Sequence, residues 1–142
     1  GDLSNRTWDK IRKDPFAPLV DKSIRAEFPP GSLYKVVVGL AALQEKVTSP
    51  SRRVNCTGHY TIGKEKFHCH KRQGHGKVNL REALIHSCDS YFYEMGIELG
   101  VDRIAKYAAM FGLGKKLDIK FGNEKTGLIP TRAWKYLTQK HQ

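Results

Sequence analysis

The sequence predicts a mostly helical fold with one small β-hairpin and without a set of central strands. Apolar residues recur at helical spacing through most of the chain after residue 30. Clusters of glycine, serine and proline divide these runs into separate elements. The short alternating stretches HYTI and FHCH lie within a segment rich in Gly, His and Lys, which indicates a hairpin on a loop.

The first part of the chain leads into one buried helix. Residues 1–30 are rich in Pro, Asp, Lys and Arg, and we expect an irregular lead-in with a short amphipathic piece near residues 8–11. Residues 32–45 carry apolar side chains on nearly every face, as in a buried helix. Thr48-Ser49-Pro50 predicts its end.

The second part of the chain alternates between loop and helix. Residues 56–76 predict the hairpin, and Asn79 can cap the helix that follows. This helix continues, or breaks into a second one, in a run that ends at Gly100. Residues 101–111 predict a third amphipathic helix, followed by a loop and one short helix.

Length and composition favour one folded domain. The chain has 142 residues, of which 39% are hydrophobic and 27% charged. The longest apolar stretch, residues 36–43, is too short to span a bilayer, and the start lacks a signal-peptide pattern. We therefore expect any export or anchoring segment to lie outside this sequence.

Ser32 and Lys35 form an S-x-x-K motif where the buried helix begins. Two prolines and a glycine precede the serine and make this entry rigid. In the first turn the serine hydroxyl lies near unpaired N–H groups, which favour a developing alkoxide. A buried lysine one turn further on can take its proton. For an isolated motif the alternative remains open that Ser32 only caps the helix and Lys35 is solvated.

A second ordered motif, Ser87-Cys88-Asp89, adds to the first. S-x-x-K together with S-D-N is typical of serine acyl-transferases that react with penicillin. The stretches FPPGSLYKVVVGLAAL, GHGKVNLREALIHSCDSYFYEMG and FGLG resemble the transpeptidase domain of the elongation-type class B penicillin-binding proteins, the penicillin-binding protein 2 family. The resemblance covers the chain from about residue 8 to residue 134.

The resemblance implies a fold and a chemistry. The fold is the mostly α part of the α/β penicillin-binding and serine β-lactamase-like fold, with its central sheet largely missing. Ser32 is then the acylated nucleophile, Lys35 its general base, and Ser87 and Asp89 the second motif, with Asp89 where many relatives have Asn. The implied reaction is peptidoglycan D,D-transpeptidation, which cross-links stem peptides ending in D-Ala-D-Ala and is blocked by β-lactams. Ordinary helix capping is the structural alternative for Ser87 and Asp89.

The resemblance also implies what surrounds the site. Residues 1–142 are expected to form a partial transpeptidase domain, divided into the lead-in and a helical part over residues 31–142. Lys125-Thr126-Gly127 spells the third family motif but lacks strand patterning around it, so we interpret it as a coincidence. The true third motif and part of the oxyanion hole then lie beyond this chain, and the chain alone is expected to be inactive. Membrane proteins of the elongation complex are the implied partners, at the periplasmic face of the inner membrane.

The net charge of +11 permits another function class. A basic surface favours anionic partners, and the competing hypothesis is a noncatalytic, zinc-stabilised module that binds nucleic acid or another polyanion. The basic residues are scattered, however, and no aromatic spacing typical of a nucleic-acid interface accompanies them. We therefore expect no nucleic-acid partner.

Three cysteines and a histidine suggest a metal site. Cys56, Cys69, His75 and Cys88 follow the pattern C-x12-C-x5-H-x12-C, and three thiols with one imidazole complete a tetrahedral set for structural zinc. The resemblance also implies a metal in this region, tying the polar loop to the second motif. A Cys56–Cys69 disulfide and free thiols remain alternatives. The substitutes for His75 are His68 and His70.

Overall fold

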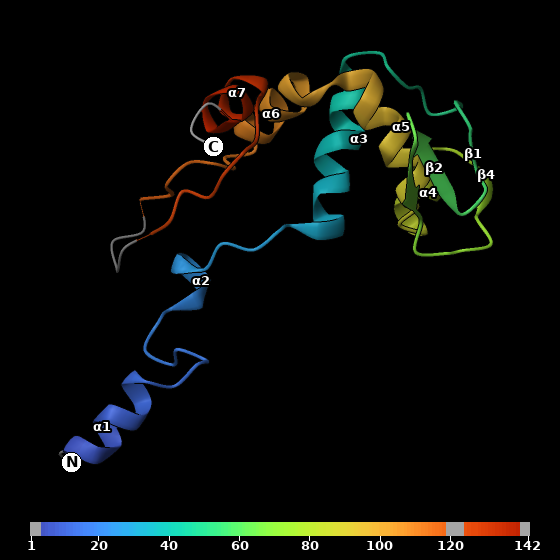
Figure 1. Ribbon diagram of the computed structural model, residues 1–142. Coiled ribbons are helices and arrows are strands. Elements are labelled where there is room, and N and C mark those ends of the chain that lie inside the picture. The colour runs from blue at the N-terminus through green and yellow to red at the C-terminus, as the bar shows by residue number, and fades with distance from the viewer. Residues whose placement is uncertain (1–3, 119–123, 140–142) are drawn as a thin grey trace.

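Helices dominate the computed structural model, which describes residues 4–118 and 124–139 (Figure 1). The helices are α1 Asn5–Arg12, α2 Lys22–Arg25, the 3-10 turn η1 Gly31–Leu33, α3 Tyr34–Gln44, α4 Leu80–Ile85, α5 Asp89–Leu99, α6 Val101–Met110 and α7 Arg132–Gln139. The strands are β1 Val54–Cys56, β2 His59–Ile62, β3 Glu65–His68 and β4 Gly76–Val78. The prediction of a mostly helical fold is confirmed.

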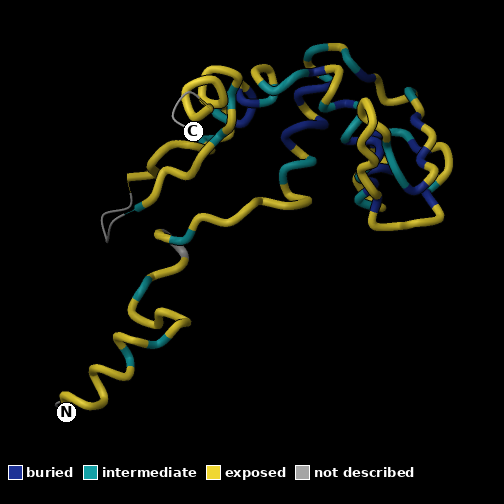
Figure 2. Tube along the Cα trace, viewed as in Figure 1, coloured by how far each residue is buried: buried dark blue, intermediate teal, exposed yellow. Residues whose placement is uncertain are grey.

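The lead-in extends away from the body of the molecule (Figure 1). Expected to be irregular, it contains the short helices α1 and α2. Ser4 caps α1 by accepting a hydrogen bond from the Thr7 N–H at 3.3 Å. No residue of α1 is buried, and Figure 2 shows the lead-in as mostly exposed. The helical pattern near Trp8 therefore forms local structure without a hydrophobic core.

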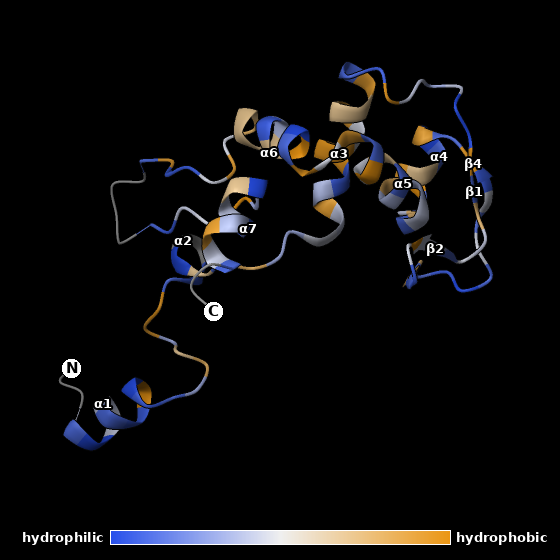
Figure 3. Ribbon diagram, turned by 45° about the horizontal axis from the view of Figure 1, so that its top comes forward, coloured by the Kyte–Doolittle hydropathy of each residue, from blue (hydrophilic) through white to orange (hydrophobic). Residues whose placement is uncertain are grey.

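The hydrophobic core lies where α3, α5 and α6 pack together. Figure 3 shows that apolar residues gather on these helices, whereas α1 is mostly hydrophilic. Alanines on α3 and α6 keep the helices close, and larger side chains of α5 fill the space between them. The main contributors are Val37, Val38, Ala41, Ala42, Tyr91, Met95, Leu99, Tyr107 and Ala108.

Helix α3 is not buried on every face, contrary to the prediction. Leu33 in the preceding turn and Val36 and Leu40 in the helix are exposed. They lie at helical spacing along one side, while the opposite side packs against α5 and α6. The helix ends at Gln44 with Glu45 as its C-cap, close to the end expected near residue 45 and a few residues before the Thr48-Ser49-Pro50 stop signal.

Two antiparallel ribbons cover one end of α5. The predicted hairpin is present as β2–β3, with His59 paired to His68 and Ile62 to Glu65. The second ribbon, β1–β4, pairs Val54 with Val78 and was not expected from the sequence. It joins the two ends of the loop that contains the hairpin, so the whole loop is closed at its base.

The helices after the loop begin and end as their sequences predict. Asn79 accepts a hydrogen bond from the Glu82 N–H at 2.9 Å, and the Asn79 N–H donates to the Glu82 carboxylate at 2.9 Å, forming a capping box. Gly100 ends α5 and starts α6. None of the helices in the described ranges is long and apolar enough to cross a bilayer.

Candidate active site and cysteine cluster

Ser32 lies in the turn η1, directly ahead of α3. Gly31 has a φ of 56°, in the left-handed region that favours glycine, so it lets the chain turn sharply before the serine. The Ser32 side chain is exposed, and its Oγ accepts a hydrogen bond from Ser87 Oγ at 2.9 Å. The S-x-x-K serine is therefore accessible and already linked to the second motif.

Lys35 points from the first turn of α3 toward the start of α5. Its side chain is only 13% exposed, and Nζ donates to Asp89 Oδ1 at 2.6 Å, to Ser87 Oγ at 2.9 Å and to the Ser87 carbonyl at 2.8 Å. An ammonium group has three N–H donors, and these three oxygens match them. Lys35 is thus held rigidly, although it is separated from Ser87 by more than 50 residues of sequence.

Ser87 occupies a strained backbone position. Its φ is 49°, and it follows α4 where the Cys88 N–H donates to the Ala83 carbonyl at 2.8 Å and the Ser87 N–H to the Leu84 carbonyl at 3.2 Å. This is a Schellman cap, whose left-handed residue is usually glycine. A serine there costs free energy, and strained residues of this kind cluster at functional sites.

Asp89, the first residue of α5, holds Lys35 in place. Partial burial opposes ionisation of this carboxyl, but hydrogen bonds from Lys35 and His70 and the charge of Lys35 outweigh it, so the pKa of Asp89 is lowered. Asp89 Oδ2 accepts from the His70 N–H at 2.9 Å, and His70 Nδ1 lies 3.3 Å from the same oxygen. Sequence reasoning missed His70 in this role; its position next to Cys69 was the available signal.

The structure brings all four predicted active-site residues together. In the described part of the chain, however, Lys35 reaches Ser32 only through Ser87, because Ser87 Oγ lies between the two side chains. The arrangement can move a proton along the two hydroxyls between the amine and the serine. It differs from the direct serine–lysine contact that the S-x-x-K spacing suggests.

A hollow of about 430 Å³ lies beside Lys35. Its lining is almost entirely apolar, apart from the lysine and two tyrosines. It is formed by Gly31, Tyr34, Lys35, Val38, Ile62, Phe92, Tyr93, Gly96, Ile97, Val101, Ile104 and Pro130.

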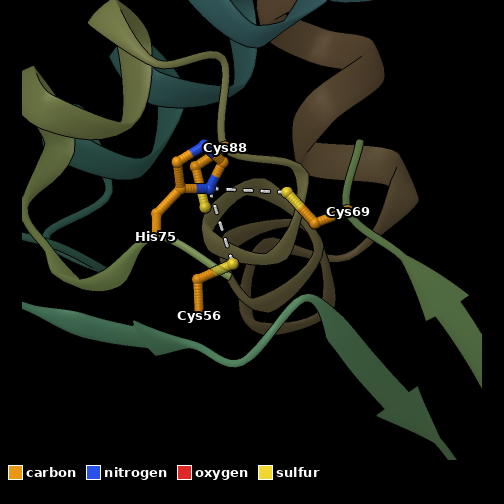
Figure 4. Close-up of side chains that lie close together, drawn as sticks. All are labelled: Cys56, Cys69, His75 and Cys88. Carbon is orange, nitrogen blue, oxygen red and sulfur yellow. Dashed lines mark hydrogen bonds between the residues drawn. The ribbon is translucent and has the colours of Figure 1, made fainter. Parts of the chain in front are cut away.

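The three cysteines and His75 also lie together. Cys56 ends β1, Cys69 follows β3, His75 precedes β4 and Cys88 caps α5. One ligand atom from each residue lies within 4.8 Å of all the others. Figure 4 shows His75 Nδ1 between two sulfurs, 3.6 Å from both Cys56 Sγ and Cys69 Sγ. We call these four residues the cysteine cluster.

The cysteine cluster has a donor set that zinc favours, and two of its distances, from His75 Nδ1 to Cys56 Sγ and to Cys69 Sγ, are 3.6 Å. Ligands of tetrahedral zinc lie roughly 3.5 to 3.8 Å apart, given the usual Zn–S and Zn–N bond lengths. Burial opposes ionisation of Cys56, but hydrogen bonds with Ser90, Gly58 and His75 lower its pKa to about 6. Burial raises the pKa of Cys88 to about 12. The three cysteines are free thiols in the structure, and all are buried.

The other histidines are placed differently. His68 faces His59 across the hairpin, with their ring centroids 6.4 Å apart. His70 Nδ1 lies 3.9 Å from Cys69 Sγ but closer to Asp89. Of the three candidate histidines, His75 is therefore the one that lies within the cysteine cluster.

The start of α5 serves both regions. Ser87 and Asp89 contact Lys35, whereas Cys88 belongs to the cysteine cluster and Ser90 Oγ lies 3.3 Å from one of its sulfurs. Alternate residues of this short stretch thus face opposite sides. Cys88 of the cluster is thus directly bonded along the chain to both residues of the second motif.

The KTG letters lie apart from this arrangement. Residues 125–127 belong to no strand in the described ranges and share a hollow with residues 26–30 of the lead-in. The interpretation of these letters as a coincidence stays a prediction.

Comparison with known proteins gives one consistent family. The chain is 31% identical over 135 residues to the peptidoglycan D,D-transpeptidase MrdA of Escherichia coli strain K12, a match that covers 94% of this chain and 21% of that protein. The solved structure of penicillin-binding protein 2 from Pseudomonas aeruginosa in complex with WCK 5153 has a TM-score of 0.90 and 34% identity, covering 97% of this chain and 32% of that one. The complex between penicillin-binding protein 2 and MreC from Helicobacter pylori gives a TM-score of 0.91 and 33% identity, covering 100% of this chain and 27% of that one.

The family assignment rests on nearly the whole sequence. The chain spans 21% of the length of the curated Escherichia coli relative, so it corresponds to part of that protein. Residues 3–141 match the family model described as the penicillin binding protein transpeptidase domain. The chain therefore belongs to the penicillin-binding protein transpeptidase family.

Proposed function

We propose that the chain supplies the nucleophile and its activating groups to a peptidoglycan D,D-transpeptidase. One observation carries the proposal: the Ser87 hydroxyl connects the exposed Ser32 to Lys35. A serine linked to a positioned amine is the arrangement that nucleophilic acyl transfer requires. The curated relative carries this activity in its name, and in our proposal the activity belongs to the complete enzyme.

In the acylation step, Ser32 Oγ attacks the carbonyl carbon of a donor stem peptide that ends in D-Ala-D-Ala. Lys35 is held as an ammonium by Asp89, so the step begins when it has released one proton to solvent. The Ser32 proton then moves to Ser87 Oγ, and the Ser87 proton moves to the resulting neutral amine of Lys35. When the C–N bond breaks, the amine of the departing D-Ala takes a proton from Ser87, which regains one from the Lys35 ammonium. The hydrogen bonds run from Lys35 through Ser87 toward Ser32, which is the direction of this second transfer.

In the second step an acceptor amine attacks the acyl-serine carbonyl. The amine loses a proton to Lys35 through Ser87, a new C–N bond forms, and Ser32 regains its proton as the ester bond breaks. Asp89 keeps the lysine in place throughout, because it lies 2.6 Å from Nζ. β-Lactams mimic the donor: Ser32 opens the lactam C–N bond and remains acylated, in accordance with the family's description as penicillin binding.

The isolated chain is proposed to be a poor catalyst. An acyl-transferase needs N–H donors aimed at the developing oxyanion, and loss of one such donor costs about a hundred- to a thousand-fold in rate. In the described ranges the strands pair only as β1–β4 and β2–β3, both on the side of α5. The third motif and its oxyanion donor are therefore assigned to the rest of the enzyme.

The cysteine cluster is proposed to hold Zn²⁺. Cys56, Cys69, His75 and Cys88 would be its ligands, and the ion would supply structural cross-linking with no part in the reaction. It would tie the loop that contains the hairpin to the start of α5, so that Ser87 and Asp89 stay against Ser32. Metal analysis of protein purified without added zinc, together with thiol counting under denaturation, tests this. Absence of metal with a single free thiol would instead establish the Cys56–Cys69 disulfide.

The location and partners follow from the same proposal. A peptidoglycan cross-linking enzyme acts where stem peptides are exposed, at the periplasmic face of the inner membrane. The Helicobacter pylori relative was solved with MreC, and we propose corresponding elongation-complex partners for the complete enzyme.

Labelling with a fluorescent penicillin tests the proposed reaction. The full-length enzyme should form a stable adduct on Ser32, identified by peptide mass analysis, whereas the 142-residue chain should form none. A full-length enzyme that stays unlabelled would refute the proposal. Efficient labelling of the chain alone would refute the assignment of the oxyanion donor to other parts of the enzyme.

A further inference from the structure

His70 lies between the cysteine cluster and the candidate active site. It directly follows Cys69, a buried member of the cluster, and its own side chain is 56% exposed. Its main-chain N–H and its imidazole both reach the same carboxylate oxygen, Asp89 Oδ2, at 2.9 Å and 3.3 Å. Its Nδ1 also lies 3.9 Å from Cys69 Sγ, so the His70 side chain reaches both Asp89 and a sulfur of the cluster.

The two oxygens of Asp89 have different partners. Oδ1 accepts from Lys35 at 2.6 Å, and Oδ2 accepts from His70. A carboxylate held at both oxygens cannot rotate about its terminal bond without losing one partner. The orientation that Asp89 presents to Lys35 therefore depends on where His70 lies.

The position of His70 is set by the loop. The N–H of the preceding residue, Cys69, donates to the Gly58 carbonyl at 2.9 Å, and Cys69 Sγ lies 3.6 Å from His75 Nδ1. Both contacts fix the backbone just before the His70 N–H. The position of Cys69 in the cluster therefore sets the position of the His70 N–H that contacts Asp89, because one peptide unit joins the two residues.

A competing interpretation is that His70 is itself a metal ligand. Cys69, His70 and Asp89 form a second group whose ligand atoms lie within 4.8 Å of one another. Both Asp89 oxygens, however, already accept N–H donors, and the Lys35 ammonium lies 2.6 Å from one of them. A cation at this point would face a positive charge, which favours the positioning role.

We propose that His70 is a positioning residue for the transpeptidase reaction, orienting the Asp89 carboxylate so that Lys35 stays aligned with Ser87. The inference rests on the proposed function and adds a residue outside both serine motifs. His70 acts through Asp89 and touches no reacting atom, so its loss should slow acylation without weakening the binding of the penicillin.

The test compares single variants of the full-length, metal-loaded enzyme. In His70→Ala the main-chain N–H remains and only the imidazole is lost, so the acylation rate constant for a fluorescent penicillin should fall about tenfold at an unchanged half-saturation concentration. His70→Asn places an N–H donor at the position of Nδ1 and should restore the rate to within about threefold. His68→Ala is the matched control, since His68 lies on the same hairpin and faces His59; it should leave the rate unchanged.

A second readout separates positioning from damage to the cluster. His70→Ala should retain the metal content and thiol reactivity of the unaltered enzyme. An unchanged acylation rate in His70→Ala, or failure of His70→Asn to restore it, would overturn the inference while leaving the proposed function intact. Loss of metal in His70→Ala would overturn it in favour of a ligand role. If the unaltered enzyme is not labelled at Ser32, the proposed function itself fails.

Discussion

The candidate active site and the cysteine cluster share the start of α5 but differ in their exposure to solvent. Ser32 is exposed, and its hydroxyl accepts a hydrogen bond from Ser87, two residues before α5 begins. The three cysteines are buried, with exposed fractions of 1% or less. A nucleophile must be open to its substrate, whereas a structural cross-link is protected by exclusion of water.

This difference in exposure distinguishes the residues expected to act in the reaction from those expected to stabilise the fold. The candidate active site contains strain at Ser87, whose φ of 49° would favour a glycine. The cluster closes a polar loop that has little core of its own, since all of β3 is exposed. We therefore expect changes at the site to affect the reaction and changes at the cluster to affect both the fold and the reaction.

The largest effect is expected from Ser32→Ala. Loss of the nucleophile should reduce acylation of the full-length enzyme by a penicillin more than about a thousand-fold. The unfolding midpoint and metal content should not change, because Ser32 is exposed and contributes no atom to the cluster. Ser51→Ala, at another exposed serine, is the control and should label normally. Labelling that persists in Ser32→Ala would place the nucleophile elsewhere.

Removing a cluster ligand should affect both regions. Cys69→Ser is expected to lose the metal and lower the free energy of unfolding by at least about 3 kcal/mol, because metal binding contributes directly to folding. Acylation should also fall, since His70 follows Cys69 and contacts Asp89. Urea unfolding with and without a chelator measures the first effect. If chelation leaves the unaltered protein as stable as before, the cluster has no metal-dependent structural role.

Ser87→Gly should raise the stability of the fold and lower the rate of acylation. Relief of the left-handed strain should stabilise the fold by about 1 kcal/mol, while loss of the hydroxyl between Lys35 and Ser32 should slow acylation about a hundredfold or more. Ser87→Ala is the matched comparison: it removes the same hydroxyl, keeps the strain and should show no gain in stability. Equal stabilities of the two variants would argue against strain at this position.

The smallest effect is expected at Glu82, which supports the second motif through the cap of α4. Its hydrogen bond from the Asn79 N–H is the main reason that its pKa lies below the ordinary value of 4.5. A lowered pKa means that the stabilisation is present above pH 4.5 and is lost as the pH falls through the folded-state pKa. Glu82→Gln keeps a capping side chain without the charge, so its thermal midpoint should depend less on pH in this acidic range. Glu27→Gln, at an exposed carboxyl outside the α4 cap, is the matched substitution against which the change in Glu82→Gln is compared.

Much of the fold could be predicted because its signals are local. Asn79 and Gly100 mark helix ends by their own chemistry, and the alternation around residues 59–68 is sufficient to indicate the hairpin. The β1–β4 ribbon was missed because its two short strands are joined only by long-range pairing. The exposed face of α3 was missed because a run of apolar residues does not show which side of the helix packs against other elements.

The sequence by itself determined which chemical groups the chain carries and how the nearest of them are spaced. It places Ser32 and Lys35 one helical turn apart and supplies three thiols and an imidazole for a metal. Only the tertiary structure decided that Ser87 lies between the lysine and the serine, and that His70 joins the cluster to Asp89. These contacts connect residues far apart in the chain, so they depend on how α3, α5 and the loop pack together, and no local pattern specifies that packing.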